Sequence, residues 1–242
     1  MPGAFTYRQK TSGLLYLIIS TNYSHLEGVF IIFLGVSEHF VFHNTKAKIY
    51  PDGTQKFIVC SKPIFKDSGW EASCRNSTFE SKPKNMLNGV RSDSVKRTKE
   101  KVFDIALINP FTHFITWTLN GDRIDRYNPV DVSKKLKVFL NNNQKRHSAM
   151  YLIIPEYHKD GAIHLHGLIS GDFQFIDSGK KTKCGKVIYN MPQWSLGYST
   201  AIELTGDSLN VAKYITKYIS KDFKKIFGSF YYSGGKGLQR LP

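Results

Sequence analysis

Apolar residues follow two different spacings along this chain, and each spacing predicts a different kind of element. Two short apolar runs, at residues 14–19 and 28–36, are separated by the polar segment "STNYSHLE". Neither run reaches the roughly 20 residues that span a bilayer, so paired buried strands are predicted instead of membrane helices. Residues 48–60 continue as strand, turn and strand, because "PDG" at 51–53 is a turn sequence between two β-rich runs.

The second half of the chain carries the clearest pattern. Strands are predicted at 114–120, 149–157, 162–170 and 198–204, and helices at 128–146 and 207–222. The first helix begins at Asn128-Pro129, and the two central strands are joined by a tight turn containing Asp160-Gly161. This order predicts an α+β fold, a ferredoxin-like split βαβ antiparallel sheet with helices packed on it.

The remaining segments show little apolar periodicity. Residues 81–101 are polar and basic, so they are expected to form an exposed connection, a basic arm or simply a solvated face. We therefore divide the chain into a β-rich N-terminal region with a basic connection (1–105), whose role is uncertain, a main domain (106–225) and a C-terminal tail (226–242).

The charge of the chain indicates which kind of partner the protein binds. Lysine and arginine outnumber aspartate and glutamate 34 to 19, a net charge of +15, which favours binding to a polyanion such as nucleic acid. The three cysteines, Cys60, Cys74 and Cys184, lack CxxC spacing, so neither a zinc ribbon nor a disulfide framework is predicted. A reducing cytoplasm fits best. Arg8 and Lys10 are not followed by one clean apolar segment, so no signal peptide is expected.

Two histidines stand one residue apart in the strand "AIHLHGLIS". Alternating side chains place His164 and His166 on one face and Leu165 on the other, which suits the binding of a divalent metal. Glu156, at the end of the preceding strand, can complete the ligand set, and His158 is the competing third ligand. The alternative is that both histidines are ordinary surface residues of a half-exposed sheet.

Two tyrosines stand four residues apart in "KYITKYISK". On a helix, Tyr214 and Tyr218 would present neighbouring phenols, and Lys217 and Lys221 follow each of them by three residues. A phenol has a pKa of about 10, so as a nucleophile it needs cationic help. The alternative is an amphipathic helix whose tyrosines border the core and whose lysines are solvated.

Taken together and in this order, "FITWTLN", "PEYHKDGAIHLHGLIS" and "NVAKYITKYISKD" resemble the motifs of rolling-circle replication initiators in the HUH endonuclease superfamily. The paired tyrosines and a W-x-x-G element, Trp194 and Gly197, resemble initiators of small single-stranded DNA phages and related plasmids. The resemblance covers roughly residues 110–242. It implies the HUH nuclease fold for the main domain.

The resemblance also implies roles for individual residues. Tyr214 and Tyr218 are the expected nucleophiles, Lys217 and Lys221 the associated lysines, and His164, His166 and Glu156 the ligands of Mg²⁺ or Mn²⁺. The reaction is nicking of single-stranded origin DNA through a 5′-phosphotyrosine, leaving a free 3′-OH, with rejoining at termination. No nucleotide cofactor is required, because the phosphodiester energy is conserved.

DNA contacts are expected from Lys213 and from the aromatic residues Trp117, Trp194 and Tyr198, although these three aromatics are equally suited to the core. No P-loop sequence is present, so a host helicase and a host DNA polymerase are expected partners in the host cytoplasm, and no membrane. The rival functions are a non-catalytic nucleic-acid-binding repressor, a single-tyrosine HUH transposase and a zinc hydrolase that uses water.

Overall fold

The computed structural model describes residues 6–9, 15–18, 29–37, 40–51, 53–66, 86–87, 90–206, 208–220 and 225–241. The chain divides into two compact units, Met1–Lys82 and Pro83–Pro242, which are considered one at a time. The expected boundary at residue 105 falls inside a helix of the second unit. Lys221, one of the expected lysines of the site, lies outside the described residues.

The first unit consists of antiparallel strands. β1 (Thr6–Gln9) pairs with β2 (Leu15–Ile18), and a separate three-stranded sheet contains β3 (Val29–Ser37), β4 (Phe40–Ile49) and β5 (Gln55–Lys66). Both N-terminal apolar runs therefore contain strands, but they pair with β1 and β4 and not with each other. The predicted turn is confirmed, because the Gly53 N–H donates to the Tyr50 carbonyl at 2.9 Å and Gly53 has φ of 82°.

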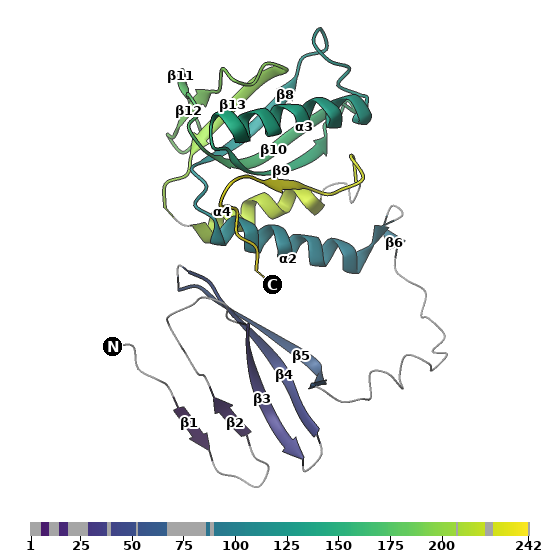
Figure 1. Ribbon diagram of the computed structural model, residues 1–242, viewed down its shortest axis with the longest axis vertical. Coiled ribbons are helices and arrows are strands. Elements are labelled where there is room, and N and C mark those ends of the chain that lie inside the picture. Colours follow the sequence, from purple (N-terminus) through teal and green to yellow (C-terminus); the bar gives the residue numbers. More distant parts are fainter. Residues whose placement is uncertain are drawn as a thin grey trace. The chain divides into compact units, whose positions relative to one another are not determined.

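The second unit is built on a seven-stranded antiparallel sheet of order β11-β12-β13-β8-β10-β9-β14 (Figure 1). Its strands are β8 (His113–Leu119), β9 (Met150–Tyr157), β10 (Ile163–Ser170), β11 (Ile176–Lys181), β12 (Val187–Asn190), β13 (Gly197–Glu203) and β14 (Tyr232–Gly234). β10 lies between β8 and β9, which are joined by the helix α3 (Pro129–Arg146). This is the split βαβ arrangement, and the predicted α+β fold class is confirmed.

α3 forms where the sequence predicts it because its start is capped. The side-chain oxygen of Asn128 accepts from the N–H groups of Val130 and Asp131 at 3.0 and 3.3 Å, and Pro129 occupies the first turn. The helix buries Val132, Leu136, Phe139 and Leu140 against one face of the sheet. These residues recur at helical spacing, so they lie along one side of the helix.

The opposite face of the sheet is covered by two other helices, α2 (Ser92–Ile108) and α4 (Ser208–Thr216) (Figure 1). α2 begins next to the short ladder of β6 (Met86–Leu87) and β7 (Val90–Arg91). Residues 92–101 are therefore not a connection or an arm, but they agree with the alternative of a solvated face, because Val95 is the one buried side chain among them. Val95 and Val102, two turns apart, are both buried and give the helix an inner face within a charged sequence.

Three further segments differ from the sequence prediction. The polar stretch before residue 189 contains the β11–β12 hairpin, which was not predicted. The predicted helix at 207–222 is α-helical only to Thr216 and continues as the 3₁₀ segment η1 (Lys217–Ser220). The expected tail contributes β14, which pairs with β9, and its Gln239 exchanges hydrogen bonds with Asn109 at the end of α2.

No helix in the described part of the chain is both long and apolar enough to cross a membrane.

Candidate active site

The face of the sheet beneath α4 carries rows of polar side chains set by strand register. Across the sheet, Glu156, His164, Thr118 and Tyr198 occupy directly paired positions, and the next row contains His166, Thr116 and Thr200. His164 and His166 therefore share one face, as predicted, while the intervening Leu165 is fully buried on the other. Sequence reasoning missed Thr116, although the alternation along β8 is sufficient to place it on this face.

His166 is held from both of its ring nitrogens. Nδ1 lies 3.1 Å from the Thr116 hydroxyl, and Nε2 lies 2.8 Å from a carboxylate oxygen of Glu156. The side chains of His166 and Glu156 are only 12% and 11% exposed, so this contact is shielded from water. The register places Glu156 opposite His164, yet its carboxylate reaches diagonally to His166.

His164 is positioned by the turn that joins β9 to β10. Its ring stacks on that of His158 with centroids 4.7 Å apart, and His158 Nδ1 lies 3.1 Å from the Asp160 carboxylate. Asp160 also accepts from the Ala162 N–H and from Arg126. Burial, together with the nearby His158, lowers the pKa of His164 and favours its neutral imidazole, the form that binds metals.

The donor types at this face suit a divalent cation, but their arrangement is not a closed ligand set. In the described part of the chain, no three histidine, cysteine, aspartate or glutamate side chains are grouped so as to hold a metal. Glu156 is engaged with His166, and His158 is stacked on His164. A cation bound here would therefore take as ligands Glu156 and His166, which already contact each other. The choice between Glu156 and His158 as third ligand stays a prediction.

The two tyrosines meet directly over the histidine face. The hydroxyl oxygens of Tyr214 and Tyr218 lie 2.9 Å apart, which confirms that the pair presents neighbouring phenols. The Tyr218 ring stacks on His166 with centroids 4.0 Å apart and rings inclined by 20°. Residues from a strand and from the segment about fifty positions later thus form one cluster.

Phe114 supports this cluster from β8. Its ring packs edge-on to Tyr214 with centroids 5.3 Å apart and lies 6.2 Å from Tyr218. Tyr214 belongs to α4 and Tyr218 to η1, so the helix tightens between them. Ala212, Ile215 and Ile219 are buried, so they form the apolar side of this helical segment.

The two phenols are not equivalent. Tyr214 is 46% exposed, whereas Tyr218 is partly covered between His166 and Phe114. Burial raises the pKa of Tyr218 well above its ordinary range, and its hydrogen bond with Tyr214 and the neighbouring Glu156 carboxylate add to this effect. The two phenols share one hydrogen bond, in which either hydroxyl can be the donor.

Lysines border the tyrosine pair on the exposed side. Lys217 Nζ lies 5.6 Å from the centre of the Tyr214 ring, a cation–π distance, and Lys213 is exposed on the preceding turn. A cation at this position can stabilise phenolate character or neutralise a phosphate, as the sequence predicts for Lys217.

The three aromatic residues expected to bind DNA have different positions. Trp117 and Trp194 are 0% and 3% exposed, and they stack on each other in the α3 core with centroids 4.5 Å apart. Their predicted role in base stacking is therefore corrected, because neither ring can reach a ligand. Tyr198 is 72% exposed and shares the row of Thr118 and His164.

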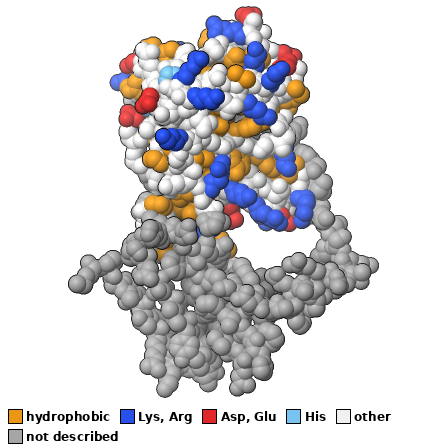
Figure 2. Space-filling model, in the orientation of Figure 1, with side chains coloured by type: hydrophobic (Ala, Val, Ile, Leu, Met, Phe, Trp, Pro, Cys, Tyr) orange, Lys and Arg blue, Asp and Glu red, His pale blue; other side chains and the backbone are white. Residues whose placement is uncertain are grey.

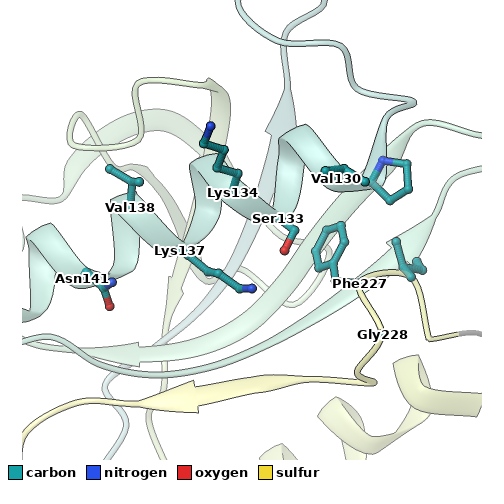
Figure 3. Close-up of a pocket in the computed structure, with 10 residues that line it drawn as sticks. Val130, Ser133, Lys134, Lys137, Val138, Asn141, Phe227 and Gly228 are labelled. Carbon is teal, nitrogen blue, oxygen red and sulfur yellow. The ribbon is translucent and has the colours of Figure 1, made fainter.

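A separate cavity lies on the α3 side of the sheet. It has a volume of about 570 Å³ and opens between α3 and the segment around Phe227, with the side chains of Lys134 and Lys137 among those lining it (Figure 3). None of the candidate site residues lines it, so it is not part of the tyrosine site.

Residues 112–223 match the model of the family described as replication-associated protein ORF2/G2P. The matched segment is somewhat less than half of the 242 residues, and it contains the histidine strand, Glu156 and both tyrosines. The match supports a replication initiator family. No curated protein and no solved structure matches the chain.

Proposed function

We propose that the protein is a rolling-circle replication initiator that nicks single-stranded origin DNA by tyrosine transesterification and rejoins the strands at termination. One observation carries this proposal: two phenol hydroxyls, 2.9 Å apart, lie over a histidine and a shielded carboxylate. The match to a replication-associated family over the same residues supports it. A protein that only binds DNA does not need two phenol hydroxyls at this position.

In the first step, the hydroxyl oxygen of one tyrosine attacks the scissile phosphorus. The phenol loses its proton, a phosphorus–oxygen bond forms on the tyrosine, and the 3′ oxygen leaves and takes up a proton. One phosphoester bond is made for each one broken, so the step needs no nucleotide cofactor. The products are a 5′-phosphotyrosine and a 3′-OH that a host polymerase can extend.

The second tyrosine gives the protein a way to end a round of synthesis. After the origin is copied, the free phenol attacks the regenerated junction, and the released 3′-OH attacks the first phosphotyrosine. This second exchange closes a circle and frees the first tyrosine. Because the two hydroxyl oxygens are within hydrogen-bond distance, both can reach the same phosphate position with small side-chain rotations.

His164, His166 and Glu156 are the residues that would hold Mg²⁺ or Mn²⁺. When bound, such an ion supplies Lewis-acid polarisation of the scissile phosphate. Thr116 fixes the orientation of the His166 ring through Nδ1, which directs Nε2 toward Glu156. Lys217 and Lys213 would neutralise phosphate charge, and Lys221 remains an expected contributor from the sequence.

Tyr198 extends the site across the sheet, where its exposed ring can stack on an unpaired base. The site and its charge provide strand exchange but no ATP-driven unwinding, so we expect a host helicase and a host DNA polymerase to act with the protein in the host cytoplasm.

The proposal can be tested without knowing the origin sequence. A pool of single-stranded oligonucleotides with a randomised centre and a 3′ label is incubated with the protein and Mn²⁺, or with a chelator. A 5′-phosphotyrosine keeps the 3′ label on the protein, so a labelled band at protein size is expected on a denaturing gel. Sequencing the captured DNA then identifies the cleavage site.

The rival functions give different results in the same experiment. A repressor would bind the pool without cutting it, and a water-using hydrolase would cut it without labelling the protein. A single-tyrosine transposase would need only one of the two tyrosines for both labelling and rejoining, whereas the proposed initiator needs both tyrosines to complete rejoining. If the double variant Tyr214→Phe/Tyr218→Phe still becomes labelled, neither tyrosine is the nucleophile.

A further inference from the structure

A basic finger projects from one edge of the large sheet. It consists of β11, β12 and the turn between them, residues 176–190, and it lies at the end of the strand order next to β13 (Figure 1). β12 pairs with β13 only at Tyr189 and Ala201, so the distal half of the hairpin has no further strand beside it. The two strands pair out to Lys181 and Val187.

The finger is ordered at both ends. At its base, Phe175 stacks on His113 of β8 with centroids 3.7 Å apart, and Tyr189 packs edge-on to both rings. At its tip, the Thr182 N–H donates to the Lys186 carbonyl at 2.8 Å, and the Thr182 hydroxyl accepts from the Lys186 N–H. An anchored base and a closed turn hold the tip in a defined position.

The charge of the finger is concentrated at this tip. Residues 178–186 contain four lysines and no acidic residue, and all four side chains are exposed: Lys180, Lys181, Lys183 and Lys186. The nearest acidic residues in the chain and in the adjoining strand are Asp177 at the base and Glu203 at the end of β13. Lysine and arginine side chains are also spread over the visible face of this unit (Figure 2).

We propose that this finger binds the phosphates of double-stranded DNA next to the strand that is nicked. A two-stranded β-ribbon fits the major groove of duplex DNA, and lysines on its tip can contact the phosphates on both sides. Sites for unpaired strands combine cations with aromatic rings that stack on bases, but residues 176–188 contain no aromatic residue. The finger therefore suits a paired region, while Tyr198 and the tyrosine site suit an unpaired one.

The position of the finger agrees with this division. Three strand spacings, roughly 14 Å, separate β12 from the histidine strand β10 across β13 and β8. A DNA molecule with a paired stem beside a single-stranded segment can therefore contact the finger with its stem and the tyrosine site with its single strand. The inference rests on the proposed function in one respect, that the polyanion is DNA.

The test measures binding of the full chain to a short labelled duplex of arbitrary sequence over a range of salt concentrations. The finger variant replaces Lys180, Lys181, Lys183 and Lys186 with glutamine. The matched control removes the same charge from exposed lysines of α3, on the other face of the sheet: Lys134, Lys135, Lys137 and Lys145. The same proteins are also measured with a single strand of equal length.

We expect the finger variant to bind the duplex about tenfold more weakly, with a salt slope reduced by roughly 0.9 for each lysine that contacts a phosphate. Its affinity for the single strand should change much less, and the α3 control should keep both. Equal losses in the two variants, no loss in the finger variant, or equal losses on duplex and single strand would overturn the inference.

Binding is measured without cleavage, so this result is separable from nicking. If duplex binding depends on the finger but no covalent product is ever found, the inference about the finger is supported and the proposed nicking function is contradicted. If the covalent product forms but the finger variant binds the duplex normally, nicking is supported and the inference about the finger is contradicted.

Discussion

At the scale of single residues, the candidate site depends on two tyrosines with different surroundings. Tyr214 is half exposed and lies beside the Lys217 ammonium, whereas Tyr218 stacks on His166 and has a raised pKa. An exposed phenol is the one that a phosphate can approach, and the Lys217 ammonium beside Tyr214 can neutralise phosphate charge there. We therefore propose that Tyr214 attacks first and Tyr218 second.

Replacing each tyrosine with phenylalanine tests this order. Tyr214→Phe should lower the rate of the first covalent labelling by about tenfold or more, while Tyr218→Phe should retain most of that rate. The measurement is a time course of labelled protein on a single-stranded substrate selected from the pool. Tyr232→Phe, on the α3 side of the sheet, is the control. Equal losses in the two site variants would contradict the assigned order.

Trp194 and Tyr198 have the same expected role in the sequence analysis, but replacing each with alanine should have different effects. Trp194→Ala removes a ring stacked in the core and should lower the free energy of unfolding by about 3–5 kcal/mol. Tyr198→Ala removes an exposed ring, so it should leave stability within about 0.5 kcal/mol of the wild type. It should instead weaken binding to single-stranded DNA. Urea unfolding and fluorescence anisotropy measure the two effects.

The residue pattern predicted part of this site and could not predict the rest. Strand alternation placed His164 and His166 on one face, and helical spacing placed Tyr214 next to Tyr218. The diagonal contact from Glu156 to His166 depends on side-chain rotamers, and the stacking of Tyr218 on His166 depends on how α4 docks. Neither follows from the spacing of residues in one element.

At the scale of elements, the site is held by close contacts between strands. Gly197 of β13 lies so near β8 that a Cβ atom there would overlap the Thr118 carbonyl oxygen and lie 2.7 Å from the Asn120 nitrogen. The W-x-x-G element therefore has a structural explanation: Trp194 fills the core and Gly197 lets β13 approach β8. This approach sets the register that puts Tyr198 in line with His164.

Gly197→Ala should consequently force β13 away from β8. We expect it to lower the free energy of unfolding by about 1–3 kcal/mol, as small-to-large changes in packed positions do. Gly121→Ala is the matched control, because a Cβ atom there meets nothing within 4 Å. The two variants are compared by urea unfolding. Similar stabilities of the two variants would contradict the close strand contact.

The elements themselves were predictable to different degrees. β8, α3, β9, β10 and β13 have strong periodicity and clear start or stop signals, such as Asn128-Pro129, and all were predicted. α2 was missed because Val95 is the one large apolar side chain in its first ten residues, and its other buried residues all lie at 102–108. The β11–β12 finger was missed because β11 is exposed and carries two lysines where a strand pattern would show apolar residues, and β12 is only four residues long.

At the scale of the whole molecule, the net charge and the candidate site both suit a nucleic-acid substrate. The net charge of +15 favours a polyanion and makes binding salt-dependent. In the proposed function, the tyrosine cluster would supply nucleophiles, the histidine face donors for a cation, and the finger phosphate contacts at the sheet edge. A protein of this construction should act on DNA that is part unpaired and part paired.

The most direct measurement of the central claim locates the DNA on the protein. Cleavage after lysine separates the two tyrosines into the peptides YITK (214–217) and YISK (218–221), so mass spectrometry of the digested covalent product can distinguish them. We predict a nucleotide joined through its 5′-phosphate to one of these peptides, mainly the one containing Tyr214 after a single nicking event. A nucleotide on any other residue, or cut DNA with no modified peptide, would contradict tyrosine transesterification at this site.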